Sequence, residues 1–321
     1  MHVARNRLIL DTDGGVDDAQ ALLLLIANGR APDAITTVFG NVNLESATEN
    51  VLATLAVAGA NVPVHTGAAE PIDQERIDAR HVHGDDGLGG APRPGKTGDV
   101  AGSDAIGFLI STLGAAAAAA ERVDLLMIGP LTNLALALER APAIAQGIGR
   151  LTIMGGTLNG RGNVTPAAEF NIFSDPEAAS VVFRTMLDTT MVPWEPCLAH
   201  ALSGADIDRM FEPVAESRYK AFTQALVQHE RKRHIQQGQG DCLFLIDPLA
   251  AAVVLEPGIV TRSVRASVGV ALEPGLTRGM TVVDPSGRVG TPPVTLVEAA
   301  RLDRLATLYE ASVRFVPRPL R

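Results

Sequence analysis

A short apolar run, a cluster of acidic residues and a longer apolar run follow one another near the start of the chain. Residues 8–10 are apolar as in a buried strand, and residues 19–27 are apolar as in a helix packed in a core. Gly14 and Gly15, which lie between them, are typical of a tight turn. Residues 7–28 therefore predict a strand, a loop and a helix, with acidic residues at the carboxyl end of the strand.

Strand-like and helix-like runs then continue to alternate. Residues 34–39 are apolar and β-branched, and residues 45–58 have the pattern of a helix. This alternation favours a single α/β domain with a mostly parallel, Rossmann-like central sheet, flanked by helices and built with right-handed crossovers. We expect further strands at residues 62–64, 123–129, 151–156 and 190–193, and further helices at residues 103–120, at residues 130–140 and from residue 175.

The segment at residues 72–102 interrupts this pattern. It has no sustained periodicity and contains glycines, prolines, His81 and His83. Structureless segments of this length are usually functional or disordered. We therefore expect a long loop that lies over the site.

Helices and strands are also predicted in the second half of the chain. Residues 213–237 have few helix breakers and predict one long helix, on which we expect His234 to lie at the surface. Asp247 and Pro248 have the residue types of an N-cap and a first helical position. We also expect one or two strands at residues 259–271 and a terminal helix at residues 296–313.

Composition limits the partners and the compartment. The 321 residues carry a net charge of -9 with a pI near 5.3, so neither nucleic acid nor an anionic membrane surface would be attracted electrostatically. Hydrophobic residues make up 46% of the chain, yet no apolar run has membrane-spanning length. The chain has two cysteines, and its first residues do not resemble a signal peptide. We expect a cytoplasmic protein with a small-molecule substrate, and one domain over residues 1–321.

Asp11, Asp13, Asp17 and Asp18 place four carboxylates within eight positions. A hard divalent cation would relieve their mutual repulsion, because such cations prefer oxygen ligands. Open parallel sheets bind ligands outside the carboxyl ends of their strands, which is where this cluster is predicted to lie. The alternative is that Asp17 and Asp18 only cap the following helix, while Asp11 and Asp13 are solvated turn residues.

A series of motifs accompanies the predicted strand ends. In order they are DTDGGVDDA, VFGN, HVHGDDGLGG, IGPLTN, MGG followed by GNVTPAAEFN, and a late Asp-Pro. From Leu8 to about Ala252, this series resembles the inosine-uridine-preferring nucleoside hydrolase family. The resemblance implies a hydrolase that cleaves the N-glycosidic bond of ribonucleosides to free base and ribose, with Ca²⁺ as cofactor. It also implies a homodimer or homotetramer.

The resemblance assigns roles to individual residues. The Ca²⁺ ligands would be Asp13, Asp18, Asp247 and the main-chain carbonyl of Ile128. Asp13 would also take a proton from the metal-bound water, and the ribose would pass through an oxocarbenium-like transition state. The ribose would be held by Asp17 and Asn171 at the 2'-hydroxyl, by Asn41 and Asp247 at the 3'-hydroxyl, and by Asn163 and Glu169 at the 5'-hydroxyl. His83, a second candidate catalytic residue, would lie in the loop that closes over the substrate.

Ile246 departs from the family pattern. In much of the family, a histidine or aromatic residue precedes the late Asp-Pro and helps the base to leave, whereas isoleucine has no proton to donate. Trp194, the only tryptophan, could stack on a base or pack in the core. The candidates for an alternative proton donor are His83, Glu195, His234 and Asp241.

Two other functions fit parts of the sequence. Residues 11–14, DTDG, also fit the nucleophile motif of haloacid-dehalogenase-like phosphatases, which would require magnesium and a downstream lysine. That function would leave Asn163, Glu169 and Asn171 without roles. A homologue that binds calcium and ribose but has weakened catalysis is compatible with the departure at Ile246.

Overall fold

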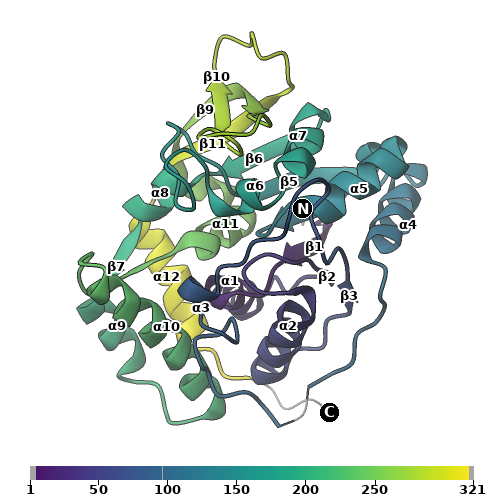
Figure 1. The fold of residues 1–321 in the computed structure, drawn as a ribbon. Coiled ribbons are helices and arrows are strands. Elements are labelled where there is room, and N and C mark those ends of the chain that lie inside the picture. The colour runs from purple at the N-terminus through teal and green to yellow at the C-terminus, as the bar shows by residue number, and fades with distance from the viewer. Residues whose placement is uncertain (1–4, 96, 318–321) are drawn as a thin grey trace.

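A central nine-stranded sheet organises the structure, a computed structural model that describes residues 5–95 and 97–317 (Figure 1). Its strands are β1 (Arg7–Thr12), β2 (Ala34–Thr37), β3 (Val64–Thr66), β4 (Val123–Met127), β5 (Ile148–Met154), β6 (Asp188–Val192), β9 (Val260–Val270), β10 (Thr281–Asp284) and β11 (Pro293–Ala300). Their order is β10-β9-β11-β6-β5-β4-β1-β2-β3. Neighbours from β11 to β3 are parallel, whereas β9 is antiparallel to both β10 and β11. The predicted α/β fold with a mostly parallel sheet is confirmed.

Helices cover both faces of this sheet. One face packs against α1 (Val16–Ala27), α2 (Leu44–Ala58), α11 (Ile246–Leu255) and α12 (Leu302–Val313). The other packs against α4 (Ala105–Ala118), α5 (Thr132–Arg140) and α7 (Pro176–Arg184). The remaining elements are α3 (Arg80–His83), α6 (Phe170–Ser174), α8 (Trp194–Ala199), α9 (Gly204–Phe211), α10 (Arg218–Gln236), two short 3-10 turns (Pro142–Gly147 and Pro257–Ile259), and the antiparallel pair β7 (Ala201–Ser203) and β8 (Cys242–Phe244).

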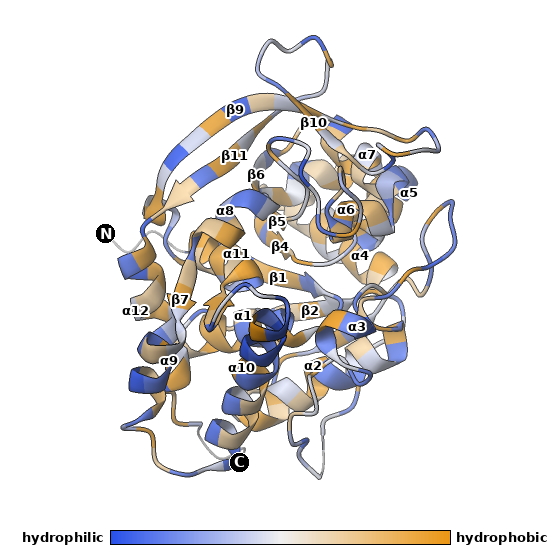
Figure 2. Cartoon of the chain, turned by 60° about the vertical axis from the view of Figure 1, so that its left-hand side comes forward, coloured by the Kyte–Doolittle hydropathy of each residue, from blue (hydrophilic) through white to orange (hydrophobic). Residues whose placement is uncertain are grey.

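Strand β1 lies at the centre of both cores. Leu8 and Leu10 face the helices of one layer and Ile9 faces those of the other, because successive side chains of a strand point to opposite faces. All three side chains are buried. A strand covered on both faces reads as a continuous apolar run, which explains the pattern at residues 8–10. Figure 2 shows the same concentration of apolar residues on the inner strands and on α11.

The order of the sheet reverses between β1 and β4. From β1 the chain proceeds outward through β2 and β3, and from β4 it proceeds outward in the other direction through β5 and β6. A crevice forms outside the carboxyl ends of the strands at such a reversal. The acidic loop after β1 therefore lies at the point of the sheet best suited to bind a ligand.

Two predicted helices have different bounds in the structure. Residues 296–300 belong to β11, where they pair with β9, and only Leu302–Val313 is helical. The long helix begins at Arg218 and not at Pro213, because the Ser217 side chain caps it by accepting a bond from the Lys220 amide.

Smaller differences occur near two prolines and in the long loop. Asp247 lies in the first turn of α11, whose N-cap is Leu245, so its predicted capping role is wrong. Pro130 precedes α5 and does not start it. The long loop is irregular, as predicted, except for the single helical turn of α3. Within the described residues, none of the helices is long and apolar enough to cross a bilayer.

Candidate functional site

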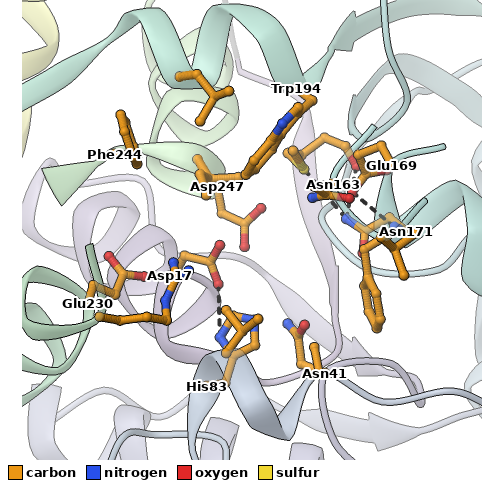
Figure 3. Close-up of a pocket in the computed structure, with 18 of the residues that line it drawn as sticks. Asp17, Asn41, His83, Asn163, Glu169, Asn171, Trp194, Glu230, Phe244 and Asp247 are labelled. Carbon is orange, nitrogen blue, oxygen red and sulfur yellow. Dashed lines mark hydrogen bonds and ion pairs between the residues drawn. The ribbon is translucent and has the colours of Figure 1, made fainter. Parts of the chain in front are cut away.

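A pocket of about 400 Å³ lies at the carboxyl ends of the central strands, a size suited to a small ligand (Figure 3). It is lined by eight of the ten residues predicted for the site: Asp17, Asn41, His83, Ile128, Asn163, Glu169, Asn171 and Asp247. The other two, Asp13 and Asp18, lie directly behind Asn41, which donates a bond to each of them. Segments from β1 to α11 thus converge on one place.

The turn after β1 holds its carboxylates by short-range contacts. Gly14 has a φ of +69°, and a Cβ atom there would lie 2.6 Å from the Cα of Ala47, so this turn requires glycine. The Gly15 amide donates to Asp18 Oδ2 at 2.8 Å, and the Thr12 hydroxyl donates to Asp18 Oδ1. These contacts fix Asp18 beneath the pocket.

Asn41 connects this turn to the end of β2. Its backbone amide donates to Asp13 Oδ2 at 2.7 Å, and its side-chain amide donates to Asp13 Oδ1 at 2.9 Å and to Asp18 Oδ2 at 3.0 Å. Asp13 is therefore held by two donors while its carboxylate stays buried. These two bonds fix the orientation of the Asp13 carboxylate.

Asp17, Asp18 and Asp247 form a group suited to a metal ion. One carboxylate oxygen from each lies within 4.8 Å of the others, and all three side chains are buried. Burial raises the pKa of Asp247 well above its ordinary value, and the charges of Asp17 and Asp18 add to the rise. Asp17 Oδ1 has no hydrogen-bond partner within the described residues. Buried, mutually repelling carboxylates with an unpaired oxygen fit a hard divalent cation.

The carboxylates of this cluster differ in one member from those that the resemblance implied. It contains Asp17, which had been assigned to the ribose, and it does not contain Asp13. Asp13 remains close enough for the charge of Asp18 to raise its pKa, after burial as the main cause.

Glu169 and Asn171 shape the far end of the pocket. Glu169 caps α6 and accepts bonds from the amides of Gly156, Asn171 and Ile172 at 2.8 to 3.2 Å. Burial nevertheless raises its pKa to about 7. The Asn171 side-chain amide donates at 3.2 Å to the carbonyls of Ile128 and Met154, at the ends of β4 and β5.

His83 enters the pocket from α3 and faces Asp17 (Figure 3). Its Nδ1 accepts a bond from the Val16 amide at 3.2 Å and lies 3.7 Å from Asp17 Oδ1. Burial lowers the pKa of His83 to about 3, so the ring is neutral. Because Nδ1 accepts, the ring proton lies on Nε2.

Two candidate proton donors have structural roles. Glu195 accepts bonds from the Leu158 and Asn159 amides, both at 2.8 Å, and so anchors the loop that carries Asn163. Asp241 is partly exposed, forms an ion pair with Arg231 and does not line the pocket. Neither is placed to protonate a substrate.

His234 is buried, so its predicted surface position is wrong. It lies on the face of α10 that also carries Glu230, Arg233 and Gln237 into the pocket. These residues have the i, i+3, i+4, i+7 spacing of one helix face. Polar residues at this spacing are also typical of a solvent-exposed helix face, so the sequence alone does not show that these residues face a pocket.

The sequence profile of the family described as inosine-uridine preferring nucleoside hydrolase matches residues 8–307. The chain belongs to this family. The enzyme is therefore a nucleoside hydrolase, and the match does not support the alternative of a haloacid-dehalogenase-like phosphatase.

Relatives of this nucleoside hydrolase cover nearly all of it. It is 36% identical over 315 residues to the "Pyrimidine-specific ribonucleoside hydrolase RihA" of Enterobacter sp. (strain 638), covering 96% of this chain and 98% of the relative. It is 37% identical to the "Non-specific ribonucleoside hydrolase RihC" of Salmonella enteritidis PT4, covering 89% and 90%. The solved structure named "Plant nucleoside hydrolase - PpNRh1 enzyme" superposes with a TM-score of 0.88 at 30% identity, covering 98% and 100%. The two bacterial relatives differ in the specificity that their names give, one pyrimidine-specific and the other non-specific.

Metal-free enzyme is expected to lose stability as the pH rises from about 4 to about 8. Burial raises the folded-state pKa of Asp17 to about 6, of Glu169 to about 7 and of Glu230 to about 8, above the roughly 4 of unfolded chains. At these three groups the folded chain binds more protons than the unfolded chain, so the stability that they contribute is fully present below about pH 4 and is lost as the pH rises through each folded-state pKa. Thermal unfolding in chelator should give a higher midpoint at pH 5 than at pH 8. The reverse order would contradict this assignment.

Proposed function

We propose that this enzyme hydrolyses the N-glycosidic bond of ribonucleosides with Ca²⁺ held by the acidic cluster. The observation that carries this proposal is one pocket with buried carboxylates at its base and Asn163, Glu169 and Asn171 at one end (Figure 3). Calcium suits the cluster because it accepts several flexible oxygen ligands, including carboxylates, carbonyls and hydroxyl groups. When bound, it would polarise a water molecule and the vicinal ribose hydroxyls.

The chain's own residues supply the remaining chemistry. Asp13, oriented by Asn41, would take the proton from the attacking water. Asp17 and Asn171 would hold the 2'-hydroxyl, and Asn41 and Asp247 the 3'-hydroxyl. The surrounding carboxylates would stabilise the positive charge that develops on the ribose ring in the transition state.

The pocket also orients the substrate. If Asn163 and Glu169 hold the 5'-hydroxyl, the ribose is fixed at C4', and the base extends in the opposite direction from C1'. That direction leads toward α10 and Phe244, on the opposite side of Asp17 and Asp247 from Asn163 (Figure 3). Trp194 and Ile246 also line the pocket.

Removal of the 2'-hydroxyl is expected to reduce kcat/KM by about 5- to 150-fold. Its buried partners would be left unsatisfied, which typically costs roughly 1 to 3 kcal/mol. Uridine and 2'-deoxyuridine form a matched pair with the same leaving base. Equal kcat/KM values for the two would contradict recognition centred on the ribose.

A substrate panel tests the proposed function. Purified enzyme with Ca²⁺ should release reducing sugar from purine or pyrimidine ribonucleosides. Ribose binding without release would instead support the catalytically weakened homologue, and phosphate release from phosphate esters would support a phosphatase. Light scattering would test the predicted homodimer or homotetramer, and fractionation of the source cells the predicted cytoplasmic location.

A further inference from the structure

The base side of the pocket contains a positive charge, whereas Ile246 supplies no proton donor there. Ile246 has no acidic hydrogen, and Glu195 and Asp241 are engaged elsewhere. Arg233, on α10, lines the pocket together with His234 and Phe244. Its guanidinium cannot release a proton near neutral pH, but it can donate charge-assisted hydrogen bonds.

His234 is also unable to deliver a proton to the pocket. Its Nδ1 lies 2.9 Å from the carbonyl oxygen of Cys242, which can only accept, so Nδ1 carries the hydrogen. Its Nε2 lies 3.0 Å from Arg233 Nη2 and must therefore accept from it. Burial lowers the pKa of His234, so the ring stays neutral, with its single hydrogen on Nδ1. The ring is also fixed by an edge contact with Phe244, at a centroid distance of 4.7 Å.

These contacts orient Arg233 and leave donors available. Arg233 Nη1 donates to Gln237 Oε1 at 3.1 Å, and Nη2 donates to His234. A guanidinium has five N–H groups, so three remain. Of these, Nε has no hydrogen-bond partner within the described residues, and neither does the nearby Glu230 Oε2.

We propose that Arg233, positioned by His234 and Gln237, contacts the departing base and stabilises it as an anion, taking the place of a proton donor at Ile246. This inference rests on the proposed nucleoside hydrolysis. It deepens that function by naming the group that assists departure.

The step balances without a further reactant. The bond between C1' and the base nitrogen breaks, and its electron pair leaves with the base. The attacking water forms the new C1'–O bond and gives one proton to Asp13. The base anion, held by Arg233, takes up a proton from solvent, and Asp13 returns its proton to solvent. The products are ribose and the neutral base.

An anionic leaving group makes the chemistry of the base decisive. Uracil has a carbonyl group where cytosine has an exocyclic amino group. A carbonyl group delocalises negative charge and accepts hydrogen bonds from a guanidinium, whereas an amino group does neither. Uridine should therefore be cleaved faster than cytidine, and this preference should depend on Arg233.

The test compares Arg233→Gln with Lys232→Gln on uridine, cytidine and p-nitrophenyl riboside. Lys232 is exposed on the same helix and does not line this pocket, so its substitution removes a charge without touching the site. Removing a donor that stabilises developing negative charge typically costs a hundred- to thousand-fold in kcat. We expect Arg233→Gln to lose about a hundred-fold on uridine, less on cytidine and no more than about three-fold on the p-nitrophenyl riboside, whose phenolate needs little help. Lys232→Gln should match the wild type on all three.

Arg233→Lys keeps the positive charge but loses the planar set of N–H donors of the guanidinium. This variant should recover part of the activity lost on uridine, whereas a purely structural role of Arg233 predicts no recovery. An equal loss on all three substrates would show that Arg233 supports folding or ribose binding, and would overturn the inference. Unchanged activity on uridine would overturn it as well, although nucleoside hydrolysis itself would stand. If the wild type released ribose from none of these substrates, the proposed function would fail and this inference with it.

Discussion

Replacement of Asp13 by asparagine is expected to lower kcat on uridine by roughly a hundred- to ten-thousand-fold, the usual contribution of a general base. Asparagine has nearly the same shape and can keep one of the two bonds from Asn41, but it cannot accept the proton of the attacking water. The KM should change less than kcat, because the ribose contacts of Asp17 and Asn171 remain.

The same substitution is expected to stabilise metal-free enzyme. Burial and the charge of Asp18 raise the pKa of Asp13, so its ionised form is unfavourable in the folded state without a cation. Steady-state kinetics and thermal unfolding in chelator measure the two effects separately. A large loss of activity together with a lower unfolding midpoint would indicate a damaged fold instead of a missing base.

Asp11→Asn provides a matched control for Asp13→Asn. Asp11 is an equally buried carboxylate two residues earlier, on β1, but its Oδ2 accepts bonds from Thr36 and Asn133. Its substitution should leave kcat within a few-fold of the wild type. If Asp11→Asn abolished activity while Asp13→Asn retained it, the assignment of the base would be wrong.

The rate of hydrolysis is expected to depend steeply on the leaving group. With Ile246 beside the late aspartate, the base departs without a proton donor, and general acid catalysis is typically worth a hundred- to ten-thousand-fold. An activated substrate such as p-nitrophenyl riboside should be cleaved at least about a hundred-fold faster than inosine or uridine. Stopped assays with equal concentrations of each substrate would measure this ratio.

Ile246→His should reduce the difference in rate between the p-nitrophenyl riboside and the natural nucleosides if the imidazole ring fits the pocket. Ile246 lines the pocket in the first turn of α11, next to Asp247, so a histidine there could reach the base. The competing explanation is that His83, whose Nε2 carries a hydrogen, already protonates the base. Natural nucleosides would then be cleaved about as fast as the activated riboside, His83→Ala would affect only the natural substrates, and Ile246→His would gain nothing.

Much of the fold could be predicted from local sequence, whereas the residues of the proposed ribose end came from the family resemblance. The strand at Leu8–Leu10 is apolar because both faces of β1 are covered, and the polar residues that follow it had to lie at a strand end. Parallel strands bring all their carboxyl ends to one edge, so Asp13 and Asn41, which follow β1 and β2, lie in contact although they are far apart in sequence. Knowledge of the strand ends was therefore sufficient to locate the pocket.

The base end of the site depends on tertiary packing that local patterns do not reveal. Arg233 and His234 belong to a charged helix segment with the composition of a solvent-exposed face. They face the pocket because α10 packs against β8, whose Cys242 carbonyl fixes His234. The strand at residues 293–300 was missed for a similar reason, since its pairing with β9 outweighs the helical pattern of residues 296–300.

Ribose release from uridine, measured on chelator-treated enzyme before and after Ca²⁺ is added back, tests most directly whether this chain is a calcium-dependent hydrolase. The buried group of Asp17, Asp18 and Asp247 predicts that release stops in chelator and returns fully at about one Ca²⁺ per chain, with bound metal counted by elemental analysis. Undiminished release by enzyme shown to contain no divalent metal would contradict that prediction.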